Sequence, residues 1–311
     1  MAGDKVSILY NPSAGMGRAL KHKIALERFL RHFGVRYDLV MTQSEDHLRQ
    51  LTRDHATRYG TLVGAGGDST FHIMVNEIVR SGADVVFGMI GAGSSNDVAR
   101  EFGVRSLFDA CRALKNGIVR PIDLGCVRAE GRQVATFLGQ ANIGLGAFVN
   151  KYVADAGART PRLAKRQTLA GLLGIGSAFR RGAVPLRLTL ESAAGRLDGE
   201  FVAAIFSNIR YWATGRVIAP AARPDDGALD ACVIGRCSFF QLARIARLAR
   251  RGRHAKARQV VFRTAEEFAV RSETPFEIQS DGEIVKTPDG RTAFREAVFD
   301  VLPRALKIVS P

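Results

Sequence analysis

The sequence predicts an α/β protein of two domains, a parallel α/β domain followed by a mostly antiparallel one. Two observations carry this prediction. Strand-like and helical patterns alternate over the first 125 residues, which is typical of a parallel sheet covered by helices on both faces. After Pro121, strand-like runs follow one another with few helices between them, which is typical of an antiparallel domain.

The first domain is predicted to span residues 1–125. Short apolar runs predict its strands at Val6–Tyr10, Tyr37–Met41, Thr61–Ala65 and Val85–Ile90. Amphipathic patterns predict helices at Arg18–Phe33, Glu45–Arg58, Thr70–Arg80, Asn96–Phe102 and Leu107–Lys115. In such sheets, ligands bind beyond the carboxyl ends of the strands.

The second domain is predicted to span residues 126–300. Its expected strands are Thr136–Ile143, Leu186–Leu190, Arg196–Ser207, Leu229–Ile234, Gln259–Thr264 and Phe294–Leu302. Two helical insertions are expected near Leu163–Arg181 and Phe239–Arg251. We interpret the remaining segment, residues 301–311 with Ala305–Val309, as one that could return to the first domain.

The net charge of the chain indicates which kinds of partner it could bind. The 311 residues carry a net charge of +15, which attracts polyanions such as nucleic acid, anionic lipid or phosphorylated ligands. Neither a run of about 20 apolar residues nor a signal-peptide pattern occurs, so a cytoplasmic location is expected. The four cysteines lack metal-site spacing and are expected to be reduced and structural.

Three glycine-rich turns each follow a predicted strand and precede a helix: Asn11–Gly17, Gly64–Thr70 and Gly91–Asp97. Glycine lets backbone N–H groups approach a phosphate closely. Each turn alone could be an ordinary turn or a helix cap, with Asp68, Ser95 or Asn96 as the capping residue. Three such turns at the ends of strands in one sheet predict a phosphate-lined crevice.

The turns contain neither the P-loop motif nor a G-x-G-x-x-G fingerprint with its acidic partner, and they carry no lysine. Phosphates would therefore be held by backbone dipoles, hydroxyl groups and Mg²⁺. A carboxylate such as Asp68 beside a phosphate makes sense mainly when Mg²⁺ or a transferable proton lies between them.

In this order, the turns resemble the diacylglycerol kinase catalytic-domain family, which includes sphingosine and ceramide kinases and bacterial lipid kinases. Its patterns are close to N-P-x-x-G, G-G-D-G-T and G-T-x-N-D-x-A-R, and the matching segments are Asn11–Gly15, Gly66–Thr70 and Gly93–Arg100. Further matches are Ile122–Gly125, Asn142–Gly146, Ile218–Ala221, Asp225–Asp230 and Ser280–Glu283.

The resemblance implies a two-domain lipid kinase of phospholipid biosynthesis, with a nucleotide-binding α/β domain, a β-sandwich-like domain and the active site between them. It implies ATP-dependent phosphorylation of a lipid hydroxyl, on diacylglycerol, a sphingoid base or a related lipid, at the membrane surface. The residues that would hold ATP are Asn11, Pro12, Ser13, Ala14, Gly15, Thr42, Gly66, Gly67, Asp68, Ser69, Thr70 and Ser94.

The same resemblance assigns chemistry to acidic residues. Asp68 and Asp97, with Asp123, would organise the phosphates and the catalytic Mg²⁺. Asp281 or Glu283 would accept the proton of the lipid hydroxyl, which is useful because an alcohol is a poor nucleophile. The loop residues Arg223, Asp226 and Ala228 match a structural Mg²⁺ site, formed partly by backbone carbonyls.

One departure from the family pattern concerns the second turn, where Ser69 replaces glycine. A side chain is costly there if the backbone has a positive φ, whereas at a negative φ the hydroxyl could contact phosphate. We predict that Ser69→Gly leaves turnover equal or higher.

Two basic amphipathic segments, Pro161–Arg181 and Phe239–Arg258, could lie on an anionic membrane or pack on the domain core. Peripheral membrane association is therefore expected, without nucleic acid as a partner, and a homodimer is left open. Two other functions remain as alternatives: a NAD kinase-like soluble phosphotransferase, and an inactive nucleotide-sensing or nucleic-acid-binding protein on the same fold.

Overall fold

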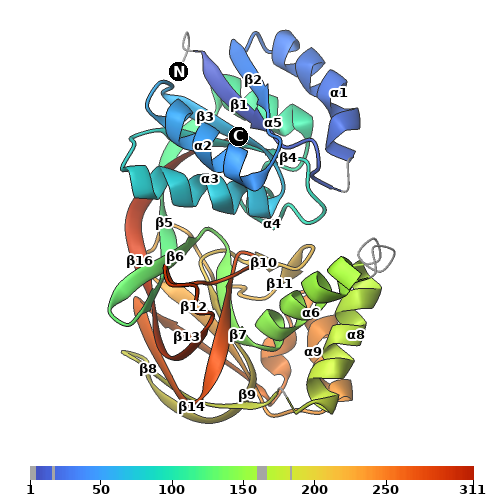
Figure 1. Cartoon of the computed structure of the whole chain (residues 1–311), viewed down its shortest axis with the longest axis vertical. Helices are drawn as coiled ribbons and strands as arrows, with labels where there is room; N and C mark the ends of the chain where they lie inside the picture. The colour runs from blue at the N-terminus through green and yellow to red at the C-terminus, as the bar shows by residue number, and fades with distance from the viewer. Residues whose placement is uncertain (1–4, 16–17, 160–166, 183) are drawn as a thin grey trace. The chain divides into compact units, whose positions relative to one another are not determined.

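We describe the protein from a computed structural model (Figure 1), which describes residues 5–15, 18–159, 167–182 and 184–311. The packing of the chain divides it into two compact units. Unit 1 contains the chain up to Leu124, together with Ala213–Gly215 and Pro303–Pro311. Unit 2 contains Gly125–Trp212 and Arg216–Leu302.

Unit 1 is built on a parallel sheet with the strand order β16-β4-β3-β1-β2. The strands are β1 (Val6–Tyr10), β2 (Tyr37–Met41), β3 (Thr61–Gly66), β4 (Val86–Gly91) and the end of β16 (Ala293–Ser310). Every residue of β1 and β3 is buried, as expected of inner strands covered on both faces. The parallel α/β prediction for this part of the chain is confirmed.

The helices described around this sheet are α1 (Arg18–His32), α2 (Glu45–Ala56), α3 (Asp68–Ser81), α4 (Asp97–Glu101) and α5 (Leu107–Asn116). Helix α1 packs against α5, and α2 packs against α3. Helices α1, α2 and α5 begin at the predicted residues, whereas α3 begins two residues before the predicted Thr70. Ser44 caps α2 and Ser106 caps α5, each accepting a hydrogen bond from a backbone N–H three residues later.

Unit 2 is strand-rich and mostly antiparallel, in agreement with the fold predicted for it. Its main strand order is β13-β12-β9-β7-β14-β16, and β8 pairs with both β9 and β14. The strands are β5 (Ile118–Ala129), β6 (Arg132–Phe137), β7 (Gln140–Gly144), β8 (Leu186–Ser192), β9 (Gly195–Ser207), β12 (Leu229–Gly235), β13 (Val260–Ala265), β14 (Glu267–Ser280) and β15 (Glu283–Ile284). A small hairpin of β10 (Tyr211–Trp212) and β11 (Arg216–Val217) stands apart.

Aromatic packing forms the centre of unit 2. The ring of Phe206 stacks on that of Phe299 with centroids 4.0 Å apart, and it also contacts Phe268. A second apolar cluster lies under the helices of this unit, which are α6 (Leu145–Arg159), α8 (Gln167–Arg180), α9 (Phe239–Ala249) and the short η1 (His254–Lys256). Figure 1 shows α6, α8 and α9 grouped at one side of these strands.

Several elements differ from the sequence prediction. The predicted strand Thr136–Ile143 is divided into β6 and β7. Helix α6 was not predicted; the left-handed Gly144 ends β7 and the helix begins at the next residue. Strands β5 and β14 were not predicted. Strand β16 runs without a break to Ser310, and its end pairs in parallel with β4 of unit 1, which is the return considered for residues 301–311. Residues 161–166 of the first basic segment lie outside the described residues.

Two further features of the fold concern membrane-spanning helices and the cysteines. In the part of the chain that the structure describes, no helix is both long and apolar enough to cross a membrane. The four cysteines are buried and free. Burial raises the pKa of the Cys111, Cys126 and Cys232 thiols to about 12, so these side chains behave as apolar core groups at neutral pH.

Candidate functional site

The three glycine-rich turns of unit 1 are joined by backbone hydrogen bonds at the carboxyl ends of β1, β3 and β4. The Asn11 N–H donates to the Ala65 carbonyl at 2.8 Å. The Gly66 carbonyl accepts from the N–H groups of Ala92, at 2.7 Å, and Gly93, at 3.1 Å. The turns therefore form one continuous surface, as the parallel topology predicts.

The first turn is shaped by the Asn11 side chain. Its carboxamide oxygen accepts the Ser13 N–H at 3.0 Å, and its Nδ2 donates to Thr70 Oγ1 at 3.1 Å. Ala14 is buried while Ser13 is exposed, and Gly15 adopts a left-handed φ of 59°. The buried Thr42 lies at the end of β2, where its N–H donates to the Tyr10 carbonyl. Asn11 thus links the first turn to the second.

Close packing requires glycine at the contact between the second and third turns. A Cβ added to Gly93 would lie 2.4 Å from the Cα of Gly67, and one added to Gly66 would lie 2.3 Å from Thr70 Oγ1. Both distances are far shorter than normal van der Waals contacts. The glycines predicted from the motif are therefore needed for the packing of the turns themselves, whatever they bind.

Helix α3 begins inside the second turn and presents an amino end without a side-chain cap. Gly67 is the N-cap residue and makes no side-chain hydrogen bond. The first turn of the helix contains Asp68, the exposed Ser69 and the buried Thr70. The N–H groups and dipole of such a helix end favour an anion, which fits a phosphate group.

Ser69 occupies a helical position and is not among the residues with a left-handed backbone. The side chain that replaces the family's glycine therefore causes no backbone strain, and its hydroxyl is exposed at the start of α3. Ser94 in the third turn is likewise exposed. Of the two situations considered for Ser69, the structure has the one with no conformational cost.

Asp68 caps a helix other than its own. Its Oδ2 accepts the Asp97 N–H at 3.2 Å and its Oδ1 accepts the Val98 N–H at 3.1 Å, both at the amino end of α4. Asn96, the N-cap residue of α4, has a left-handed φ of 52°, and its carboxamide exchanges two hydrogen bonds with the backbone of Gly93. These contacts hold the second and third turns in a fixed arrangement.

Asp97 is buried, and its carboxylate binds the backbone of a distant segment, Ala213–Gly215, which the sequence did not predict to lie here. Its carboxylate accepts the Gly215 N–H at 2.7 Å, the Thr214 N–H at 3.0 Å and the Ser95 hydroxyl at 2.6 Å. Ala213, Thr214 and Gly215 are consecutive left-handed residues with φ values of 47°, 70° and 83°. The only signal for this turn in the sequence is the glycine at 215, which favours a positive φ.

The third acidic residue of unit 1, Asp123, is also buried, and its Oδ1 accepts the Arg304 N–H at 2.8 Å. In the described part of the chain no three His, Cys, Asp or Glu side chains gather closely enough to hold a metal ion by themselves. Mg²⁺ is usually bound by one or two carboxylates together with substrate phosphates and water. Asp68, with Asp97 beside it, fits that kind of donor set.

In unit 2, the predicted acidic turn has two different carboxylates. Asp281, at a left-handed φ of 46°, accepts three backbone N–H groups, from Leu138 at 2.7 Å and from Gly139 and Gln140 at 2.9 Å each. Glu283 begins β15 and is exposed. Asp281 therefore shapes the turn between β6 and β7, whereas the Glu283 carboxylate faces solvent.

The loop before β12 contains the residues assigned to a structural Mg²⁺ site. Asp226 is exposed, and its Oδ1 accepts the Ala228 N–H at 3.2 Å. Arg223 lies 3.6 Å from the Asp225 carboxylate. Burial raises the pKa of nearby Asp230, and the charge of Asp226 adds to this effect. An exposed carboxylate and adjacent carbonyls are hard oxygen donors, so the loop fits Mg²⁺.

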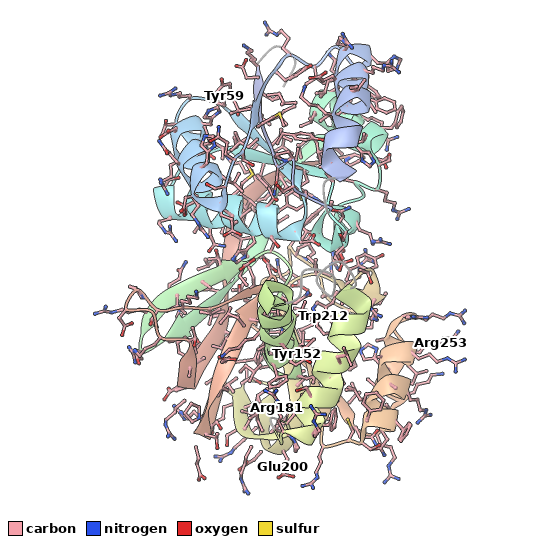
Figure 2. All side chains as sticks on the ribbon, turned by 45° about the vertical axis from the view of Figure 1, so that its right-hand side comes forward. Tyr59, Tyr152, Arg181, Glu200, Trp212 and Arg253 are labelled. Carbon is pink, nitrogen blue, oxygen red and sulfur yellow. The ribbon has the colours of Figure 1, made fainter. Side chains whose placement is uncertain are left out.

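A cavity of about 580 Å³ lies within unit 2 between α6, the end of α8 and strand β14. Phe148, Leu186 and Phe276 give it apolar walls. Arg181 supplies positive charge, whereas Lys151 forms an ion pair with Glu277, which also lines the cavity, at 2.5 Å. Figure 2 labels Tyr152 and Arg181, two of its lining residues. The cavity thus joins apolar side chains to a few charged ones at one edge of unit 2.

Comparison with known proteins identifies the family of the chain. Residues 5–127 match the family model of the diacylglycerol kinase catalytic domain, and residues 139–310 match the YegS C-terminal NAD kinase beta sandwich-like domain. The chain belongs to the diacylglycerol kinase catalytic-domain family. This confirms the family that the three turns resemble and the two-domain fold class predicted from the alternation of strands and helices.

Relatives of this family member match it over most of their length. A diacylglycerol kinase of Bacillus subtilis is 23% identical over 90% of this chain and 89% of its own. One from Mycobacterium tuberculosis is 27% identical over 99% of this chain and 95% of its own. A crystal structure of a diacylglycerol kinase from Bacillus anthracis has a TM-score of 0.71 at 16% identity, covering 100% of this chain and 98% of its own, which shows a shared fold.

Proposed function

We propose that this protein transfers the γ-phosphoryl group of ATP to the hydroxyl of a membrane lipid of the diacylglycerol type. The single observation that carries the proposal is the joined set of glycine turns at the ends of β1, β3 and β4, with the uncapped amino end of α3 inside it. Membership of a kinase family and relatives named diacylglycerol kinase support the acceptor class.

In this reaction the lipid hydroxyl oxygen forms a bond to the γ-phosphorus, and the bond from that phosphorus to the bridging oxygen breaks to release ADP. The hydroxyl proton passes to a carboxylate. Little covalent chemistry is required of the protein, so its contribution is alignment and charge neutralisation. ATP supplies the phosphoryl group when bound, and Mg²⁺ would neutralise its phosphates.

For nucleotide binding we propose the first and second turns. The residues that would line the phosphates are Asn11, Pro12, Ser13, Ala14, Gly15, Gly66, Gly67, Ser69 and Thr70, with Thr42 and Ser94 at the margin. Ser69 and Ser94 are exposed and can donate hydroxyl hydrogen bonds. The α3 dipole favours the negative charge of a phosphate.

For the metal we propose Asp68 and Asp97, with Asp123 supporting their surroundings. Each of these carboxylates already accepts backbone N–H groups, which fixes its position. A carboxylate has about four lone-pair sites, so these contacts leave acceptor capacity for a cation. The loop of Arg223, Asp226 and Ala228 is proposed as a second, structural Mg²⁺ site.

Asp281 and Glu283 are the two candidates for the proton acceptor, and their surroundings differ. The Asp281 carboxylate accepts three backbone N–H groups, which fix its position and occupy part of its acceptor capacity. Glu283 is exposed and unconstrained by comparable contacts among those described. We expect Glu283→Gln to lower kcat with little change in melting temperature, and Asp281→Asn to lower both.

For the apolar part of the lipid we propose the cavity lined by Phe148, Leu186 and Phe276. A larger side chain placed in the cavity tests whether the lipid binds there. Ala293 lies exposed at its edge, so Ala293→Trp can narrow the cavity without disturbing a buried position. We expect this variant to raise KM for long-chain diacylglycerol more than for a short-chain analogue.

The experiment that tests the proposed function is transfer of γ-labelled phosphate from ATP to a panel of acceptors. The panel contains diacylglycerol, phosphatidylglycerol and a sphingoid base in detergent micelles, and NAD in solution. We expect label in the lipid phase, lost when EDTA removes Mg²⁺. Label in NAD alone would instead support a soluble phosphotransferase.

A further inference from the structure

Helix α9 and the turn that follows it carry positive charges and no negative ones. We call this surface the arginine face. Its members are exposed cations: Arg244, Arg247, Arg250, Arg251, Arg253, Lys256 and Arg258. The segment Phe239–Arg258 contains no Asp or Glu. Among the ion pairs within the described residues, none involves a member of the arginine face. Figure 2 labels Arg253 at the outer side of α9.

The arginine face is mounted on a rigid support. Ser238 and Gln241 form a capping box that starts α9. Leu242, Ile245 and Ala249 are buried on the inner side of the helix, in the second apolar cluster of unit 2. The fully buried His254 bonds the Ile218 carbonyl through Nε2 at 2.9 Å, which fixes the turn after the helix. The apolar stripe therefore packs on the core, and the cations remain outside.

Exposed apolar side chains lie on α9 itself and on the adjoining helix α8. Phe240 at the start of α9 is 83% exposed, and Leu173 on α8 is 47% exposed. The ring of Phe239, itself 40% exposed, contacts that of Phe179 on α8 with centroids 6.4 Å apart, so the two helices form one surface. Exposed apolar groups of this size next to a one-signed cationic field indicate an interaction surface.

The combination distinguishes two kinds of anionic partner. A membrane offers anionic headgroups for Arg and Lys, and a boundary region into which Phe and Leu can be buried. A nucleic-acid duplex offers phosphates but gives an exposed Leu and Phe at the edge of the patch no apolar region to enter. Charge and apolar exposure together favour the membrane.

We propose that the arginine face, with Phe240 as an apolar anchor, docks this protein on bilayers rich in anionic phospholipid. The inference rests on the proposed function in one respect, since it explains how a kinase would reach an acceptor that resides in a membrane. Because the attraction is electrostatic, docking weakens as salt rises.

The test uses sedimentation of the full chain with vesicles of phosphatidylcholine, alone or mixed with phosphatidylglycerol. Each Arg near an anionic surface contributes about five-fold to partitioning, so we expect Arg244→Gln, Arg247→Gln and Arg251→Gln together to weaken binding about 100-fold. Phe240→Ser should weaken it about ten-fold, through lost apolar burial. The matched control is Arg187→Gln, Arg196→Gln and Arg271→Gln, three exposed positions on β8, β9 and β14 with the same change in net charge.

The proposal is supported if the control variant binds like the unmodified protein while the α9 variant does not. Equal weakening by both triple variants would overturn it, because net charge alone would then explain binding. So would displacement of the protein from vesicles by a DNA duplex at equal phosphate concentration, combined with no effect of Phe240→Ser.

Phosphate transfer to diacylglycerol in neutral detergent micelles separates docking from the reaction. We expect the α9 triple variant to keep the unmodified rate there, and an equal loss of rate in micelles would overturn the docking role. If no variant transfers phosphate but the vesicle results keep the expected pattern, the proposed function fails and the docking surface stands.

Discussion

The carboxylate of Asp68 caps the helix that contains Asp97, at 3.2 Å from the Asp97 N–H and 3.1 Å from the Val98 N–H. Two acidic residues from different glycine turns are thereby held next to each other, about 30 residues apart in the chain. Such an arrangement costs electrostatic repulsion unless hydrogen-bond donors or a cation offset it. The backbone N–H groups of Thr214 and Gly215 supply part of that compensation at Asp97.

Removing the Asp68 carboxylate should cost both stability and activity. In Asp68→Ala the first N–H groups of α4 lose their acceptor, and we expect a loss of about 1–2 kcal/mol in the free energy of unfolding. Phosphate transfer should fall at least 100-fold if this carboxylate positions Mg²⁺. Urea unfolding and steady-state kinetics measure the two effects.

Ser106→Ala is the matched control for this variant, because Ser106 caps α5 with a hydrogen bond to the Asp109 N–H at 3.1 Å. It should lose about 1 kcal/mol of stability and keep its turnover. If both variants lost activity in proportion to stability, Asp68 would have a structural role only.

The contact between Gly67 and Gly93 predicts the effect of a single methyl group. Gly93→Ala would place Cβ 2.4 Å from the Cα of Gly67, so the turns must separate. We expect a loss of about 1–3 kcal/mol in stability and weaker ATP binding. Gly60→Ala serves as the control, since a Cβ there meets nothing within 4 Å and should change stability by less than about 0.5 kcal/mol. Isothermal calorimetry with ATP that gave equal affinities for both variants would disprove the role of this contact.

Ser69→Gly tests the departure from the family motif. Because Ser69 is helical, glycine removes an exposed hydroxyl and makes the first turn of α3 slightly more flexible, at a cost of a few tenths of a kcal/mol. We predict turnover equal to or higher than that of the unmodified protein. Steady-state kinetics at saturating ATP measures it, and complete loss of activity would contradict the placement of this turn.

The buried His254 predicts a loss of stability in mild acid. Burial lowers the pKa of its imidazole below the usual 6.5, although the hydrogen bond to the Ile218 carbonyl opposes this. The unfolded chain therefore binds a proton at a higher pH than the folded one, and stability falls as the pH drops below about 6.5. The pKa of His55 is also lowered by burial and acts in the same direction.

Melting temperatures measured from about pH 7.5 to pH 5 check the effect of His254. The unmodified protein should lose stability across this range, and His254→Gln should show a shallower slope. An identical slope in the variant would mean that His254 does not contribute.

The sequence predicted the strands of unit 1 closely because each apolar run is short and bounded by turn residues. The predicted bounds of Val6–Tyr10 and Tyr37–Met41 are those of β1 and β2. Strand β14 was not predicted because Pro275 and several charged residues interrupt its alternation of apolar and polar residues. The register shift between Arg271 and Phe276 accommodates that interruption.

The candidate site was predictable in its residues but not in its contacts. Glycine turns at strand ends are a local signal, whereas the capping of α4 by Asp68 depends on tertiary packing between two turns. The same holds for the left-handed segment Ala213–Gly215 at Asp97, whose partner lies more than 100 residues away. Local sequence patterns do not predict such hydrogen bonds, because these bonds form only when the fold brings distant segments together.

The most direct test of the central claim is organic-phase extraction after incubation with γ-labelled ATP, Mg²⁺ and diacylglycerol micelles, for the unmodified protein and for Asp68→Ala. We expect labelled phosphatidic acid from the unmodified protein and a loss of at least 100-fold in the variant. No label in any lipid, from a folded protein that still binds ATP, would contradict it.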